Sequence, residues 1–160
     1  MKLFKKNYHL TAVCDGRCAP LSEIPDEAFA SGMLGLGVAI HPTGSHFCCP
    51  VSGTVQSVSD SRHAYTLLSE DGLELLVHIG VDTVELKGEG FTPLVLPGQR
   101  VRAGIPLAEV DLQKIHDRGL SSVTAVLITN PEEIEILEYG YGQVTGGETP
   151  ILTYRAAKKG

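Results

Sequence analysis

The chain has 160 residues, of which 42% are hydrophobic and 20% charged, a length and composition that suit one globular domain. Its 13 Lys and Arg against 19 Asp and Glu give a formal net charge of −6, and an acidic surface repels the phosphate backbone of nucleic acids. No apolar run is long enough to cross a bilayer, and the basic start over residues 1–6 lacks the apolar stretch of a secretory signal. We therefore expect a cytoplasmic protein with no nucleic acid partner.

The cysteine pattern does not indicate a redox or metal site. Cys48 and Cys49 are adjacent and do not readily bridge each other, and no spacing, including that of Cys14 and Cys18, is CxxC. The pattern therefore favours small residues in a reducing compartment.

The domain organisation follows from turn signals and short apolar segments. We expect a flexible leader over 1–10, a single domain over 11–155 and a tail over 156–160. The expected fold is all-β, an antiparallel sandwich or barrel-sandwich, because Gly and Pro turns separate the apolar segments. The segments "PVSGTVQSV" and "PGQRVRAGIPLAEV" suggest a duplicated strand motif. Strands are expected within 37–40, 53–58, 64–68, 73–79, 123–129 and 150–154.

Two short helices are expected among these strands. Asp111 is placed to cap a helix that ends at Gly119. Asn130 is placed to cap a second helix, with Pro131 at its first position and Gly140 at its end.

Two histidines stand apart from the other four. His78 ends an apolar strand, and His63 lies 15 residues earlier, with one turn between them. A four-residue loop over 69–72 would place the two histidines directly opposite each other in a hairpin. A two-residue turn would make them diagonal on one face, and a three-residue loop would put them on opposite faces.

The side-chain alternation favours a shared, exposed face for the two histidines. The outward residues would be Glu74, Leu76 and His78, where the polar His63 also belongs. The inward residues would be the apolar set Leu73, Leu75, Val77 and Ile79.

Two close imidazoles can carry a phosphoryl group. A neutral imidazole is nucleophilic at Nε2 when its proton is held on Nδ1, and a backbone carbonyl near Gly80 could hold it there. The second ring can donate to phosphate oxygens, and the Ser61 hydroxyl is placed to orient His63. A zinc site formed by both histidines and either Asp82 or Glu74 remains open at this point.

The stretch "VHIGVDTVELKGEGF" is similar, almost residue for residue, to the active-site signature of the glucose-family enzyme IIA component of the bacterial sugar phosphotransferase system. The blocks "GVAIHPTG", "PVSGTV", "GLELLVH", "GQRVRAGIPLAEVDL", "VLITN" and "GETPIL" match too, in the family's order. The resemblance covers about 25–153 of the chain and is highly specific.

The resemblance implies a role for each residue of the site. His78 would be phosphorylated on Nε2, and His63 would hold the phosphate. Ser61 stands where the family commonly has Thr beside that partner, the Gly80 carbonyl would fix the active ring, and Asp82 would be the acidic residue close to the site.

The resemblance also implies partners. The phosphocarrier HPr would be the donor and a sugar-specific IIB domain the acceptor, regulatory targets are possible, and no cofactor is needed. A zinc ion bridging His63 and His78 is known in some family complexes. Phe29, Leu76 and Val84 are expected to contact partners, although Leu76 and Ser59 stand where the family often has Phe.

Other functional classes fit less well. A regulatory binding module overlaps with the phosphocarrier, and a domain excised from a larger permease would look like a standalone subunit. Sandwich-like zinc peptidases need a His-x-His pair, which the sequence lacks. Lipoyl carriers need Lys at a hairpin tip, where this chain has "EDG".

Overall fold

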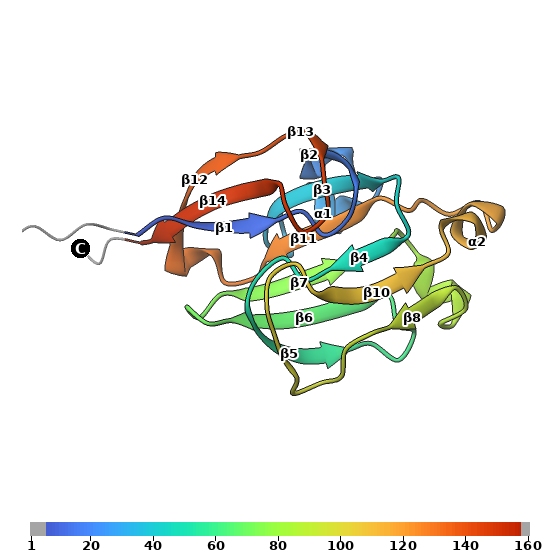
Figure 1. Cartoon of the computed structure of the whole chain (residues 1–160). Coiled ribbons are helices and arrows are strands. Elements are labelled where there is room, and N and C mark those ends of the chain that lie inside the picture. The colour runs from blue at the N-terminus through green and yellow to red at the C-terminus, as the bar shows by residue number, and fades with distance from the viewer. Residues whose placement is uncertain (1–5, 158–160) are drawn as a thin grey trace, which may run out of the picture.

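Strands make up most of the regular secondary structure in the computed structural model, which describes residues 6–157 (Figure 1). The strands are β1 (Tyr8–Thr11), β2 (Gly16–Pro20), β3 (Leu36–Pro42), β4 (His46–Cys48), β5 (Gly53–Val58), β6 (Ala64–Ser69), β7 (Glu74–His78), β8 (Phe91–Pro93), β9 (Arg100–Val101), β10 (Pro106–Val110), β11 (Thr124–Ile128), β12 (Ile134–Tyr139), β13 (Gly142–Val144) and β14 (Pro150–Ala156). The short helices are η1 (Leu21–Glu23), α1 (Glu27–Ala30), η2 (Thr83–Leu86), α2 (Leu112–Asp117) and η3 (Pro131–Glu133).

The largest sheet has the strand order β13-β2-β3-β11-β7-β6-β5-β9, and its neighbours pair antiparallel. Two three-stranded sheets, β1-β14-β12 and β4-β10-β8, complete the antiparallel architecture. The expectation of an all-β, antiparallel fold is confirmed. Within the described residues, no helix is both long and apolar enough to cross a membrane.

The large sheet is apolar on both faces at its centre. Its inner face contributes alternate residues of β7 and β11, such as Leu75, Val77 and Val126, to the main core. Its outer face carries a second, smaller apolar cluster that includes Ala39, Ala125 and Leu127 and, from the chain between β2 and β3, Leu21, Ile24 and Phe29. The chain between β2 and β3 therefore covers part of the outer face, and we call residues 21–30 the cover segment.

The hairpin of β6 and β7 has a three-residue loop, so the structure adopts the third of the three loop lengths considered and not the four-residue or two-residue loop. Ser69 still belongs to the ladder, because its backbone N donates to the carbonyl of Leu73 at 2.8 Å. The Ser69 hydroxyl accepts from the Leu73 backbone N at 2.8 Å and donates to Asp71. Gly72, with φ +92°, takes the left-handed position that such a loop requires.

One of the two expected helices is confirmed. In α2 the Asp111 carboxylate accepts from the backbone N atoms of Gln113 and Lys114, as a capping residue does.

The second expected helix is wrong, because only the single turn η3 forms and the chain continues as strand β12. The side chain of Asn130 makes no cap. It accepts from Glu74 N at 2.9 Å and donates to the Gly72 carbonyl at 3.1 Å. The alternation of half-buried Ile134 and Ile136 with exposed Glu135 then suits a strand on the core.

The ends of the domain differ from the expected boundaries. Strand β1 begins at Tyr8 and pairs with β14, so residues 8–10 belong to a sheet and not to a flexible leader (Figure 1). Strand β14 runs to Ala156, one residue into the expected tail. The rest of the leader over 1–5 and of the tail over 158–160 lies outside the described residues.

We predict that Asp111→Ala lowers the free energy of unfolding by about 1 kcal/mol, because two backbone N–H groups of α2 lose their acceptor. Chemical denaturation monitored by circular dichroism measures this. Asp111→Asn is the control and should retain most of the stability, since Asn caps equally well. An equal loss in both variants would contradict the capping role.

Candidate active site

His78 lies on the outer face of the large sheet, at the end of β7. Its register neighbours are Ala64 on β6 and Ala125 on β11. Both neighbours present only a methyl group on that face, so the imidazole has room on either side. Sheet geometry thus places a half-buried ring between two small residues, as the alternation of β7 predicted.

The His78 ring is fixed by the turn that follows it. Nδ1 lies 2.9 Å from the Gly80 carbonyl oxygen, so Nδ1 donates its proton there and Nε2 is left as the nucleophilic nitrogen. Gly80 has φ +82°, and a Cβ at this position would lie 2.4 Å from Thr83 Cγ2 and 2.9 Å from the Ser121 carbonyl. Only glycine fits this turn without strain.

His63 and His78 lie together, although not by the expected register. Their ring centroids are 4.9 Å apart and the rings are nearly perpendicular, at 87°. A three-residue loop was expected to separate them, but β6 starts at Ala64, and His63 precedes the strand in a bend after Arg62, whose φ is 62°. Side-chain alternation does not apply in such a bend. The carbonyl of His63 still accepts from Ile79 N at 2.8 Å, which holds the bend against β7.

The hydroxyl group beside His63 is that of Ser59. Ser59 Oγ lies 3.3 Å from His63 Nδ1 and also accepts from Ala64 N at 3.1 Å. The expected role of the Ser61 hydroxyl finds no support in these contacts, and Ser61 acts on the ring through a backbone hydrogen bond that raises the pKa of His63. The tight turn over 59–62 places Ser59 opposite Ala64, and strand alternation does not reveal this.

Burial keeps both imidazoles neutral to lower pH than usual. Desolvation lowers the pKa of His63. The side chain of His63 is buried, whereas the sequence predicted an exposed one. The pKa of His78 is lowered by desolvation and then by its neighbour His63, and is raised by the Gly80 hydrogen bond and by the charges of Asp26 and Asp82. The net effect favours the neutral, nucleophilic form near neutral pH.

Two residues of the cover segment complete the site. The Phe29 ring lies against His78, with centroids 4.8 Å apart at a tilt of 52°. Asp26 caps α1 by accepting from Ala28 N at 3.0 Å, and its charge acts on His78. We did not single out Asp26 from the sequence, although "PDEAF" contains the acidic capping residue that would have revealed α1.

Of the remaining predicted site residues, Asp82 lies near enough to His78 to act on it through its charge. Asp82 is exposed in a left-handed conformation before η2, and Val84 in η2 exposes 52% of its surface. Leu76 is half buried in the outer cluster with Phe29. The Arg62 side chain lies against Gly88, where a Cβ would lie 3.3 Å from Arg62 Cδ.

The alternative of a zinc site with a carboxylate from this chain is not supported. Glu74 pairs with Leu68 at the far end of β7 from His78. Over residues 6–157 no group of three or more His, Cys, Asp or Glu side chains is arranged to hold a metal ion. A metal between the two histidines would therefore need ligands from elsewhere.

We predict that Gly80→Ala destabilises the protein by about 2–4 kcal/mol, from the positive φ and the overpacking against Thr83 and Ser121. Chemical denaturation measures the change. Gly72→Ala is the matched control, because Gly72 has φ +92° but no atom lies within 4 Å of the position that a Cβ would take, and it should cost about 1 kcal/mol. Equal losses would show that the close contacts at Gly80 do not matter.

We predict that His63 and His78 both titrate below the usual value of about 6.5, because burial disfavours their charged forms. As the pH falls from 7, both rings should remain neutral past the point where an exposed imidazole is half protonated. NMR titration of the ring protons measures the two midpoints. A midpoint at or above about 6.5 for His78 would contradict this balance of burial and charge.

Comparison with known proteins identifies the family. The sequence profile of the family described as phosphoenolpyruvate-dependent sugar phosphotransferase system, EIIA 1, matches residues 8–134. The glucose-specific EIIA component of Haemophilus influenzae is 36% identical over 140 residues, covering 88% of this chain and 84% of that protein. The glucose-specific EIIBCA component of Corynebacterium glutamicum is 42% identical over 139 residues, covering 87% of this chain but 20% of that longer protein.

A solved structure agrees with these relatives. Glucose permease IIA from Mycoplasma capricolum superposes with a TM-score of 0.89 at 36% identity, covering 96% of this chain and 99% of that one. The fold and the sequence therefore indicate the same family. The chain belongs to the EIIA 1 family of the phosphoenolpyruvate-dependent sugar phosphotransferase system, and it is a phosphocarrier for sugar uptake.

Proposed function

We propose that His78 accepts a phosphoryl group on Nε2 from HPr and passes it to a sugar-specific IIB domain. The observation that carries this proposal is the 2.9 Å contact of Nδ1 with the Gly80 carbonyl, which leaves Nε2 free beside His63. In the transfer, a bond forms between Nε2 and phosphorus while the donor's bond to phosphorus breaks. The Nδ1 proton stays in its hydrogen bond throughout.

His63 stabilises the phosphate in this proposal. A phosphate dianion beside His63 favours the imidazolium form, which offsets the effect of burial on its pKa. One ring nitrogen then donates to a phosphate oxygen while Ser59 and the Ser61 backbone hold the rest of the ring. The centroids of the two rings are 4.9 Å apart, so a phosphate on Nε2 of His78 would lie close to the His63 ring.

The surroundings of the pair suit a visiting protein. Apolar Phe29 and Leu76 line the outer face, and Val84 is exposed beside it. Asp26 and Asp82 add negative charge near His78, which complements a donor with a positively charged docking surface. Phosphorylation adds about two negative charges to this face, so a regulatory protein that binds the free form would discriminate between the two states.

The family places this chemistry among phosphotransferases, and we assign the chain the transferase step of a sugar kinase system of the EC 2.7.1 type. The reaction needs positioning and electrostatics, which these side chains supply. We place it in the cytoplasm, where the phosphoenolpyruvate that feeds the relay is made. All four cysteines are free, which suits a reducing compartment.

The test is phosphorylation by phosphoenolpyruvate, enzyme I and HPr, followed by transfer to a IIB domain. We predict that His78→Ala accepts nothing, and that His63→Ala accepts but transfers about 10²–10³-fold more slowly. The wild-type adduct should be labile in acid and stable in base. His46→Ala is the control and should behave as wild type, because His46 lies on β4 in another sheet. Acceptance by His78→Ala would disprove the assignment.

A further inference from the structure

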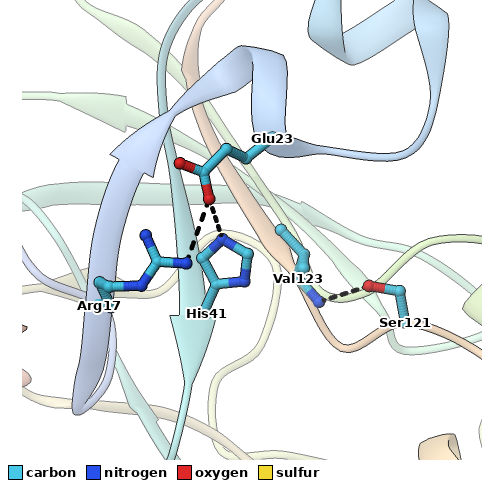
Figure 2. A network of polar contacts seen from close by, with 5 residues as sticks. All are labelled: Arg17, Glu23, His41, Ser121 and Val123. Atoms are coloured by element: carbon cyan, nitrogen blue, oxygen red, sulfur yellow. Dashed lines mark hydrogen bonds and ion pairs between the residues drawn. The ribbon is translucent and has the colours of Figure 1, made fainter.

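A polar network anchors the cover segment near its start, at Glu23 (Figure 2). Arg17 on β2 and His41 on β3 are register partners, and both side chains reach Glu23 at the end of η1. The same carboxylate oxygen, Glu23 Oε1, accepts from Arg17 Nη2 at 3.1 Å and from His41 Nε2 at 2.9 Å. The two contacts tie η1 to two adjacent strands at once.

The cover segment depends on such contacts for its position. It contains a three-residue turn and the four-residue helix α1, which are too short to be stable alone. Ile24, directly after Glu23, and Phe29 are its buried side chains, with 3% and 7% exposure. We call Ile24 and Phe29 the two apolar anchors of the cover segment, and Glu23 directly precedes the first of them.

The second anchor touches the reacting residue. Phe29 lies against the His78 ring, and Asp26, between the two anchors, acts on His78 through its charge. The distance in sequence from Glu23 to Phe29 is small, so a shift of η1 moves α1 as well. The polar network thus holds the cover segment at Glu23, and the same short segment touches His78 through Phe29.

We propose that Glu23 is a positioning residue for phosphoryl transfer: by holding Arg17 and His41 it fixes the cover segment on the sheet, so that Phe29 stays against the His78 ring. This inference rests on the proposed function of His78. Across residues 6–157, Glu23 has no direct contact with His63 or His78 in the hydrogen-bond network, so it acts through the segment. The ion pairs are partly exposed and contribute little to global stability, so the effect is local to the site.

The test is Glu23→Gln, with Glu27→Gln as the matched control. Both remove one negative charge from the cover segment, but Glu27 is exposed at the start of α1 and lies outside the network. Loss of a nearby negative charge would by itself lower the pKa of His78. Withdrawal of Phe29 would raise it, because burial is the largest cause of the lowered pKa and the Phe29 ring lies against His78. The two effects therefore differ in sign.

We predict that Glu23→Gln raises the NMR-measured pKa of His78 toward its ordinary value and slows acceptance from HPr about three- to tenfold, with little change in the denaturation midpoint. Glu27→Gln should show no rise and no slowing. In a Phe29→Leu background, Glu23→Gln should add little, because the residue through which it acts is already changed.

Three results would overturn the proposal: an unchanged or lowered pKa in Glu23→Gln, the same changes in Glu27→Gln, or effects of Glu23→Gln and Phe29→Leu that simply add. The titration needs no phosphate donor. A wild-type protein that accepts no phosphoryl group would refute the proposed function, while the effect of Glu23 on the His78 ring would still be measured.

Discussion

The hydrogen bond from His78 Nδ1 to the Gly80 carbonyl is the contact on which the site depends. It decides which nitrogen carries the proton and so which nitrogen is the nucleophile. The carbonyl is itself held in place from both sides. The buried Thr83 hydroxyl donates to the Ile79 carbonyl at 2.5 Å, and Val81 N donates to the Ser121 carbonyl at 2.9 Å. The acceptor is therefore positioned before any partner arrives, and no reorganisation is needed during transfer.

The sequence predicted those features that depend on local, regular structure. Alternation along β7 correctly placed Leu75 and Val77 inward and His78 outward, because a strand paired on both sides keeps its period. The cap of α2 was also predicted, since Asp111 contacts only the next two or three residues. The resemblance supplied the roles of both histidines, which pattern alone left open.

The features that the sequence did not reveal depend on irregular backbone or distant contacts. Ser59, not Ser61, contacts His63 through its hydroxyl because the chain turns tightly between β5 and β6, where alternation fails. Asn130 bonds to the backbone of the hairpin 56 and 58 residues away, and its capping role was therefore predicted wrongly. Phe29 matched the family, but its contact with His78 requires the fold of the cover segment.

The charges around His78 bear on its proposed role, in which it takes up a phosphoryl group and releases it again. Burial and His63 keep the ring neutral and nucleophilic, whereas Asp26 and Asp82 act in the opposite direction on its pKa. In the proposed function a phosphoryl group attached to His78 is repelled by the same carboxylates, so the loaded state is less stable than in an all-cationic site. A docked partner that brings cations removes that repulsion while it is bound. A carrier that bound phosphate too tightly would stop the relay, so in the proposed function the acids near His78 favour release of the phosphoryl group, and the cations of a docked donor offset them during uptake.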